Sequence, residues 1–434
     1  MNLPITARVN KMNHLEIGGC DTVGLAKEFG TPLYVMDEAT LREKCREYAQ
    51  SFRAHYPDTR IVFASKALSC TAVLKVIDSE GVGVDVSSGG ELYTARLAAC
   101  GMKNIYYHGN NKSRAELKEA VDAGVGRIVV DNLAELERLD EIAGHAKKEV
   151  DILFRMNPGI EAHTHEFIQT GKIDSKFGIQ RQDIIEAVRV ANEKKYVNFV
   201  GIHSHIGSQI FDIEPFEAEV DVLCQTAKDI LDQTRTEVME LNLGGGLGIS
   251  YLGDEKVPGT GEFAERICKR LMARIKELSL PAPRLILEPG RSLVGNAGVT
   301  LYEIGVIKDI PGVRKYIMID GGMADNPRPI LYDAKYAAYV ANKFNEDNGA
   351  KERVTVAGRF CESGDVILRD VELKKVEVGD VLAVTATGAY NYSMASNYNR
   401  VCRPAMVMLN QGQAYEIIRR ENYEDITRMD VVIS

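Results

Sequence analysis

A regular alternation of apolar strand patterns and amphipathic helix patterns, from residue 60 to residue 291, most constrains the fold of this chain. Eight short apolar stretches begin there, and each but the last precedes a helical pattern. Such alternation requires a parallel sheet, and eight repeats over roughly 230 residues match a closed (β/α)₈ barrel. A doubly wound open sheet is the alternative, but no G-x-G-x-x-G sequence follows the first strand.

The alternation stops after Arg291, where short β patterns separated by Gly, Pro and Asp turns take over. A chain of 434 residues is also too long for one ordinary hydrophobic core. We therefore expect an α/β protein with two domains. Residues 36–290 would form the (β/α)₈ barrel, and residues 291–434 would form a mostly β domain together with the N-terminal residues 1–35.

Charge and composition exclude several classes of protein. A formal net charge of -9 opposes binding to nucleic acid, which requires a basic surface. No apolar run reaches the length that spans a bilayer, and the first residues lack the apolar core of a signal peptide. The eight cysteines are scattered, with no C-x-x-C pair and no zinc-type cluster. We expect a cytoplasmic protein with no metal site and no nucleic-acid or membrane partner.

Polar residues gather at the carboxyl ends of the eight predicted strands, the edge at which barrel enzymes place their chemistry. These residues are Lys66, Asp85, His108, Asn110, Arg155, Asn157, His203, His205, Ser208, the glycines at 244–246, Glu288 and Arg291. The connection at residues 159–178 is longer than the others. It is either a lid over this edge or an insertion without function.

Lys66 follows the first apolar strand, residues 61–64, by two positions. Burial of a lysine disfavours its charged form, and a neutral amine is the nucleophile that forms a Schiff base. The alternative is a lysine that extends from the strand end into solvent. The polar residues at the other strand ends favour the chemical interpretation, in which a buried Lys66 lies at the floor of a barrel site.

The sequence LGGGLG at residues 243–248 supplies bare backbone amides that can approach a phosphate closely. It follows the seventh strand and precedes a helix that we expect to begin near Gly261. This corner of a barrel commonly binds phosphate, and Ser208 could add a hydroxyl group to the same site. A tight turn without a ligand is the alternative.

Glu288, in the sequence EPGR, ends the eighth strand. Beside a pyridine nitrogen its carboxylate would keep that nitrogen protonated, whereas the alternative is a buried ion pair with Arg291. His205 lies on the sixth strand with His203 on the same face, and it could stack on a planar cofactor or form a core hydrogen bond. Zinc is disfavoured because no third ligand lies at a suitable spacing from these histidines.

The β domain contains three further candidates. The Cys361 thiol could donate a proton or be structural, and Glu362 could bind a substrate ammonium group. The aromatic and small polar residues at 388–399 suit a binding loop. Arg328, with Tyr332 close by in the sequence NPRPILY, could bind a carboxylate through two hydrogen bonds.

The sequences FASKAL, HGNNK, HSHIGSQ, LNLGGGLG, EPGR, NPRPILY, CESGD and GAYNYSMASNYN occur in this order between residues 33 and 399. Together they resemble the diaminopimelate decarboxylases, pyridoxal-phosphate-dependent enzymes of the alanine-racemase fold. The resemblance is specific because its motifs come from both expected domains, and none of the motifs departs from the family pattern.

The resemblance implies a role for each matching residue. Lys66 would form the Schiff base with pyridoxal phosphate, His205 would stack on its ring, and Glu288 would pair with its nitrogen. Cys361 would be the proton donor, delivered from the neighbouring subunit of a homodimer with shared active sites. The other cofactor-binding residues would be Asp85, Ser208, Gly245, Gly246, Gly290, Arg291 and Tyr390. The substrate would contact Arg291, Arg328, Tyr332, Glu362 and Tyr390.

The implied reaction is the decarboxylation of meso-2,6-diaminopimelate to L-lysine, the last step of lysine biosynthesis. Three alternatives stay open from the sequence: a related arginine or ornithine decarboxylase, an amino-acid racemase of the same fold, and a non-catalytic protein that binds pyridoxal phosphate. Arg328 opposes the first, which would need an acidic pocket for a distal cation.

Overall fold

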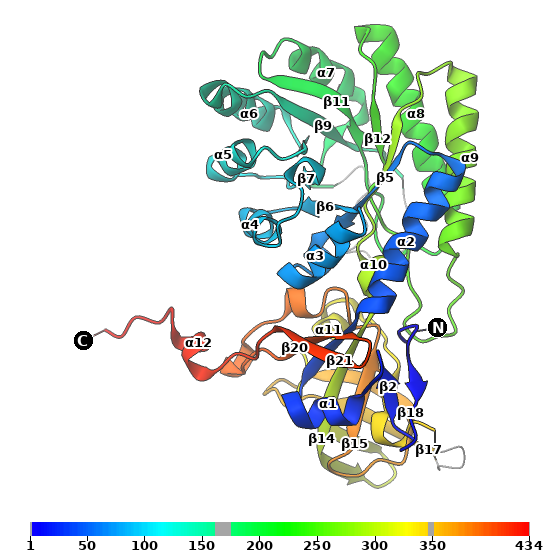
Figure 1. Cartoon of the computed structure of the whole chain (residues 1–434), viewed down its shortest axis with the longest axis vertical. Helices are drawn as coiled ribbons and strands as arrows, with labels where there is room; N and C mark the ends of the chain where they lie inside the picture. Colours follow the sequence, from blue (N-terminus) through cyan, green and yellow to red (C-terminus); the bar gives the residue numbers. More distant parts are fainter. Residues whose placement is uncertain (1, 161–174, 346–350, 434) are drawn as a thin grey trace. The chain divides into compact units, whose positions relative to one another are not determined.

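The structure is a computed structural model that describes residues 2–160, 175–345 and 351–433 (Figure 1). Contacts within the chain divide it into two compact units. Unit 1 comprises Met1–Arg42, Ile249–Lys256 and Leu293–Ser434, and unit 2 comprises Glu43–Gly248 and Val257–Ser292. The chain therefore enters unit 1 a second time through a segment of only eight residues, which the β-α pattern of the sequence did not separate from its surroundings.

Eight parallel strands close a barrel in unit 2, as the sequence predicted. In order around the barrel they are β5 (Thr59–Ala64), β6 (Gly83–Val86), β7 (Ile105–Tyr107), β8 (Arg127–Val130), β9 (Val150–Asn157), β11 (Val197–His203), β12 (Glu240–Asn242) and β13 (Arg284–Leu287). The short strand β10 (Ile179–Gln180) pairs with β9 outside this ring.

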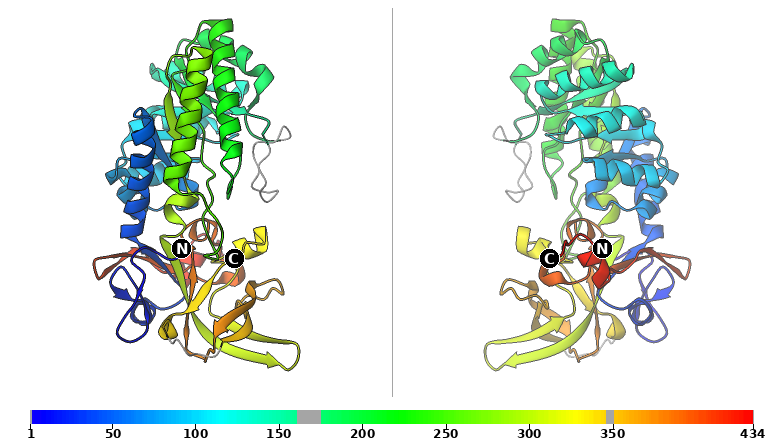
Figure 2. Two further views of the ribbon diagram at one scale, coloured as in Figure 1. Left: turned by 90° about the vertical axis from the view of Figure 1, so that its right-hand side faces the viewer. Right: turned by 90° about the vertical axis from the view of Figure 1, so that its left-hand side faces the viewer.

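Helices follow the barrel strands in the alternation that the sequence predicted (Figure 2). They are α3 (Thr71–Ser79), α4 (Gly89–Leu97), α5 (Arg114–Ala123), α6 (Leu133–Ala146), α7 (Ile184–Asn192), α8 (Glu214–Thr234), α9 (Thr260–Leu278) and the short α10 (Arg291–Val294), with α2 (Glu38–His55) ahead of β5. None of the described helices is both long and apolar enough to cross a membrane.

Apolar side chains fill the inside of the barrel. One buried layer takes residues from six of the eight strands: Val62, Tyr106, Val129, Leu153, Val200 and Ile286. Filling by alternating inward side chains is typical of such barrels and leaves the chemistry to the strand ends. Outside the barrel, Phe216 of α8 packs edge-on against Phe263 of α9 with ring centroids 4.9 Å apart.

Unit 1 is built on a mostly antiparallel sheet in the order β18-β17-β15-β14-β4-β20-β21, with β19 pairing β14 and β16. Its strands are β4 (Leu33–Asp37), β14 (Gly298–Ile310), β15 (Arg314–Ile319), β16 (Ala338–Val340), β17 (Lys351–Ala357), β18 (Val366–Lys374), β19 (Val381–Thr385), β20 (Ala405–Asn410) and β21 (Gln413–Ile418). A small sheet is formed by β1 (Arg8–Val9), β2 (Leu15–Ile17) and β3 (Cys20–Asp21). The sequence identified most of the large sheet's strands after residue 291 but missed β16 and β21.

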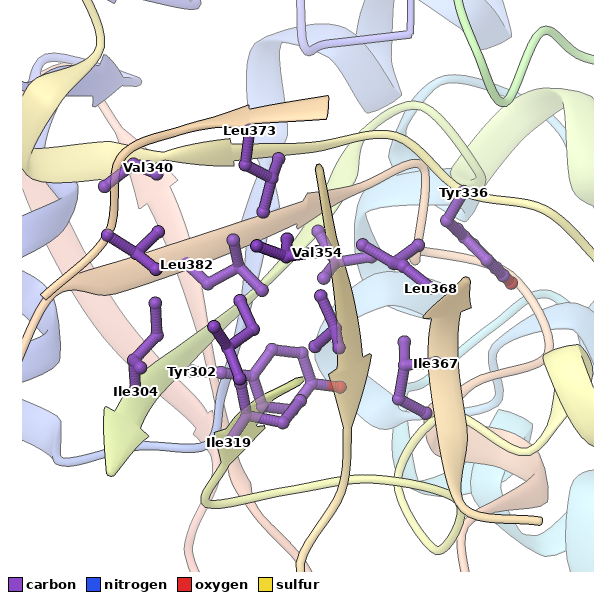
Figure 3. Packing of buried hydrophobic residues seen from close by; sticks show 14 of the residues in the cluster. Tyr302, Ile304, Ile319, Tyr336, Val340, Val354, Ile367, Leu368, Leu373 and Leu382 are labelled. Atoms are coloured by element: carbon purple, nitrogen blue, oxygen red, sulfur yellow. The ribbon is translucent and has the colours of Figure 1, made fainter. Parts of the chain in front are cut away.

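Short helices complete unit 1: α1 (Thr22–Phe29), α11 (Arg328–Tyr332) and α12 (Tyr423–Thr427). One core of this unit packs side chains from strands β14 to β19, among them Tyr302, Val354 and Leu382 (Figure 3). Ile249 and Tyr251, from the short segment between the two parts of unit 2, belong to the same core. Tyr251 packs edge-on against Tyr336, with ring centroids 5.1 Å apart.

A carboxyl group is buried within unit 2. Glu219 of α8 has no exposed surface, and its hydrogen-bond partner is the Ser204 hydroxyl. Burial raises the pKa of Glu219 to about 8, so the folded protein keeps its proton where the unfolded chain has lost it. The stability that this group contributes is fully present below the unfolded pKa of about 4.3 and is lost as the pH rises toward 8.

Glu219→Gln removes this titration. We expect the variant to gain stability relative to the wild type between pH 5 and pH 8, by a few kcal/mol, because each pKa unit corresponds to about 1.4 kcal/mol. Urea denaturation at both pH values measures the gain. Glu265→Gln, at an exposed position of α9, is the matched control. An equal pH dependence for the wild type and Glu219→Gln would show that Glu219 ionises normally.

Candidate active site

Lys66 lies just beyond the end of β5, on the one-turn 3₁₀ helix η1 (Ser65–Ala67). Its side chain is exposed, so the expectation that this lysine is buried is wrong. The 3₁₀ turn explains the difference, because it buries Ser65 and Ala67 and turns the residue between them outward. Lys66 remains close enough to Asp85 and His205 to act electrostatically on both.

Glu288 lies directly after β13, and three side chains from other strands surround its carboxylate. Asn242 donates from Nδ2 to Oε1 at 2.7 Å, and His108 Nε2 lies 2.9 Å from the same oxygen. His203 Nε2 lies 3.3 Å from Oε2. All four side chains are buried. The sequence placed His108 and His203 at this edge of the barrel but gave no sign of the pairing, and it did not mark Asn242.

The surroundings of Glu288 fix its charge. Burial alone would raise its pKa, but the two neighbouring histidines hold the pKa well below its usual range. Burial lowers the pKa of His203 to about 3. Burial alone would lower the pKa of His108, but the negative charges of Asp85 and Glu288 outweigh this effect and raise the pKa. Asp85, in turn, is buried, and its pKa rises to about 7. The cluster thus contains an ionised Glu288 facing a neutral His203.

Two side chains that could join His203 in binding a metal lie near it in space, although no suitable spacing in the sequence marks them. Ligand atoms of His108, His203 and Glu288 lie within 4.8 Å of one another. They come from three strands that are far apart in the sequence, so residue spacing could not reveal them. His108 and Asn242 already occupy one oxygen of Glu288, and hydrogen bonds therefore account for this arrangement without an ion.

The glycine loop after β12 admits no side chains. A Cβ atom on Gly245 would come within 2.2 Å of the Glu288 carbonyl oxygen, and one on Gly246 within 2.5 Å of the Gly207 carbonyl oxygen. Gly246 also has φ +128°, a conformation that other residues rarely adopt. At Gly244 a Cβ would lie 2.9 Å from Nδ1 of His205. This close approach of bare backbone fits a phosphate cradle.

Two polar side chains meet beside the glycine loop in unit 2: the Arg291 guanidinium donates from Nη2 to the Ser208 hydroxyl at 2.9 Å. Gly290 packs against Ala64 and Ala67, which lie on either side of Lys66 in the chain. The helix predicted to begin near Gly261 is α9, which begins at Thr260, and residues 249–256, which separate it from the loop, belong to unit 1. Backbone amides and Arg291, rather than that helix, are available for an anion here.

In unit 1, Arg328 begins helix α11, and its guanidinium is buried between aromatic rings. It donates from Nη1 to the Tyr336 hydroxyl at 2.6 Å and lies 4.8 Å from the ring centroid of Tyr251. The Tyr336 hydroxyl is also 3.3 Å from Oδ1 of Asn391. Among the described residues, Nε of Arg328 has no hydrogen-bond partner, and no carboxylate forms an ion pair with the guanidinium. Sequence reasoning missed both tyrosines.

The remaining candidates of unit 1 lie in loops and on α11. Cys361 and Glu362 are exposed, and the backbone amide of Cys361 donates to Asn399 Oδ1 at 2.9 Å. Tyr332 and Tyr390 are half-buried, and Tyr390 has the unusual φ of 61°. The structure thus groups the predicted site residues by unit. Lys66, Asp85, His205, Ser208, Gly245, Gly246, Glu288, Gly290 and Arg291 lie in unit 2, and Arg328, Tyr332, Cys361, Glu362 and Tyr390 lie in unit 1.

Most of the long connection at residues 159–178, for which the sequence offered a lid as one interpretation, lies outside the described residues. Its described end is tied to the barrel. The guanidinium of Arg155 lies 4.1 Å from the ring centroid of Phe177. Gly178 has φ +77° and approaches the carbonyl oxygen of Arg155.

Comparisons with known proteins identify the family to which this chain belongs. The pyridoxal-binding domain of the pyridoxal-dependent decarboxylases matches residues 38–295. The diaminopimelate decarboxylase of Synechocystis sp. is 47% identical over 437 residues, which cover 99% of this chain and 92% of that protein. The chain belongs to the diaminopimelate decarboxylase family. The Bacillus subtilis diaminopimelate decarboxylase is 43% identical over 428 residues, with 98% of this chain and 97% of that protein covered.

A solved structure of the family has the same fold throughout. The diaminopimelate decarboxylase from M. jannaschii, crystallised with L-lysine, superimposes with a TM-score of 0.93 at 39% identity, covering 100% of this chain and 99% of that one. Membership of the diaminopimelate decarboxylase family confirms the resemblance predicted from the motifs and makes the chain a pyridoxal-dependent decarboxylase.

Proposed function

We propose that this chain decarboxylates meso-2,6-diaminopimelate to L-lysine and carbon dioxide, with pyridoxal 5'-phosphate as its cofactor. Family membership supports the reaction class. The observation that supports this substrate is Arg328, a buried guanidinium that forms no ion pair with a carboxylate of the described residues. Meso-diaminopimelate has a carboxylate remote from the bond that breaks, which a guanidinium binds well. Ornithine and arginine have a cation at that end, which Arg328 would repel.

The strand ends of unit 2 suit the cofactor. When bound, pyridoxal phosphate would accept the electron pair left by the departing carbon dioxide. Lys66 is exposed and would hold the cofactor covalently, while the imidazole of His205 would stack on its ring and Glu288 would accept a hydrogen bond from the ring nitrogen. The low pKa of Glu288 would favour the proton of that hydrogen bond on the ring nitrogen. The other contacts would come from Asp85, Ser208, Gly245, Gly246, Gly290, Arg291 and Tyr390.

The residues of unit 1 would bind the substrate and deliver a proton. Arg328 would bind the remote carboxylate, Glu362 the remote ammonium group, and Cys361 would protonate the carbon that has lost carbon dioxide. In this proposal the enzyme is a cytoplasmic homodimer, and the Cys361 loop serves the active site of the neighbouring subunit. The exposure of Cys361 and Glu362 agrees with a loop that acts outside its own subunit. Tyr332, Tyr390 and Arg291 would complete the substrate contacts.

Product identification tests the proposal. The purified protein, loaded with pyridoxal phosphate, is given meso-diaminopimelate, L-ornithine or L-arginine, and the amines and carbon dioxide are quantified. We expect L-lysine and an equal amount of carbon dioxide from the first substrate alone. Turnover of ornithine or arginine without turnover of diaminopimelate would overturn the substrate assignment. A D-amino acid formed without carbon dioxide would identify a racemase.

Arg328→Met is expected to raise the KM for meso-diaminopimelate by about 10- to 100-fold, because a hydrogen bond to a charged group contributes about 1.5–3 kcal/mol. Steady-state kinetics measures the change. Arg353→Met, at an exposed position of the same unit, is the control and should leave KM unchanged. Tyr336→Phe removes the hydroxyl that holds Arg328 and should raise KM by a smaller factor. A normal KM in Arg328→Met would assign the remote carboxylate to another residue.

A further inference from the structure

The Glu288 carboxylate is nearly saturated with protein donors. Its Oε1 accepts hydrogen bonds from Asn242 Nδ2 at 2.7 Å and from His108 Nε2 at 2.9 Å. Its Oε2 lies 3.3 Å from Nε2 of His203. A carboxylate offers about four acceptor positions, so about one remains for a group outside the protein. The donors follow or end three different strands, β7, β11 and β12, so the direction of the remaining position is fixed by the barrel itself.

His108 differs from the other two donors because it lies between two carboxylates. Its Nε2 is 2.9 Å from Glu288 Oε1 and 4.0 Å from Asp85 Oδ1, and all three side chains are buried. Its ring also contacts the ring of His203 edge-on, with centroids 4.8 Å apart. His203 is neutral and Asn242 carries no charge, so His108 is the donor here whose charge can offset that of Glu288.

The backbone around His108 is held firmly. Its amide donates to the Val86 carbonyl at 2.8 Å, which extends the pairing of β7 with β6 by one residue. The buried Lys112 ammonium donates to the Gly109 carbonyl at 2.8 Å, to the Val129 carbonyl at 2.7 Å and to the Glu135 carboxylate at 2.6 Å. Lys112 thus links the backbone of Gly109, the residue after His108, to strand β8 through hydrogen bonds. The backbone that carries the imidazole of His108 is therefore held in place.

We propose that His108 is a positioning residue that orients the Glu288 carboxylate toward the ring nitrogen of the bound cofactor. The inference rests on the proposed function, since it concerns the same cofactor. A paired Glu288 has a low affinity for protons, which keeps the shared proton on the ring nitrogen, and the fixed donors prevent the carboxylate from rotating away. Without His108, Glu288 would keep the neutral donors Asn242 and His203 and would be less firmly ionised.

A binding experiment separates this role from a merely structural one. Apoenzyme is titrated with pyridoxal phosphate and with an analogue in which CH replaces the ring nitrogen, and the two dissociation constants are compared. The wild type should bind pyridoxal phosphate more tightly. His108→Phe should reduce that preference about 10-fold, because the analogue never used the Glu288 contact. His108→Gln keeps a neutral donor and should retain an intermediate preference.

Tyr107→Phe changes the buried residue next to His108 and is the matched control, with an unchanged preference expected. The positioning role would be overturned if His108→Phe weakened the binding of both ligands equally. It would also be overturned if His108→Gln and His108→Phe both kept the wild-type preference for pyridoxal phosphate. If His108→Phe does not fold, an unchanged preference in His108→Gln overturns it alone. A wild-type apoenzyme that binds neither ligand would instead refute the proposed function.

Discussion

Lys66→Ala is expected to lower kcat by about 10³-fold or more, because the variant loses the group proposed to hold the cofactor covalently. The side chain is exposed on its 3₁₀ turn and makes no contribution to the barrel core, so the fold should persist. Wild-type protein loaded with pyridoxal phosphate should show the visible absorbance of a lysine-linked cofactor. This band should be missing from the variant, and carbon dioxide release should fall in parallel.

Lys75→Ala is the matched control, since Lys75 is an exposed lysine on the following helix, α3. It should keep both the absorbance and the activity. After borohydride reduction and proteolysis, the labelled peptide of the wild type should contain Lys66. If borohydride reduction still links the cofactor covalently to Lys66→Ala, another lysine holds the cofactor.

Cys361→Ala should slow turnover by about 10²- to 10⁴-fold, the range for loss of a positioned general acid. Cofactor affinity and visible absorbance should stay normal, because Cys361 lies in unit 1 and the proposed cofactor contacts, Tyr390 apart, lie in unit 2. The expected loss is in kcat rather than KM, since the thiol is proposed to act after the bond to carbon dioxide has broken. Measured kcat and KM for meso-diaminopimelate decide this.

Cys402→Ala provides the comparison, because Cys402 is another free cysteine of unit 1 and has no proposed role. If Cys361 is the acid of the proposed homodimer, mixing inactive Cys361→Ala with inactive Lys66→Ala should restore part of the activity, since a mixed dimer would contain one intact shared site. Near-normal turnover in Cys361→Ala would remove it as the proton donor. Full loss without any restoration on mixing would place Cys361 in the site of its own subunit.

The sequence predicted the barrel and the edge that carries its polar residues, because strand and helix periodicity are local signals and parallel strands align their carboxyl ends. It could not predict which of those residues touch. His108 and Glu288 are 180 positions apart in the chain, and only barrel closure brings them within 2.9 Å. The same holds for Arg328 and Tyr251, whose contact depends on a chain crossing between units.

Other errors have local causes. Lys66 was expected to be buried because an apolar strand precedes it, but the 3₁₀ turn after the strand reverses the direction of the side chain. The strand β21 was missed because its half-exposed residues, QAYEII, lack a clear alternation. The local pattern also gave no sign that residues 249–256, between the glycine loop and α9, belong to the core of unit 1.

That short segment has a consequence for anyone who recombines enzymes of this fold. A barrel excised at residues 43–292 would carry Ile249 and Tyr251 away from the core of unit 1. Unit 1 would then have a cavity in its core, and the excised barrel would have two apolar side chains without their packing partners. Only two residues separate the last glycine of the cradle, Gly246, from Ile249. Chimeras should therefore inherit residues 249–256 from the parent that donates unit 1, with the crossover placed at Gly248.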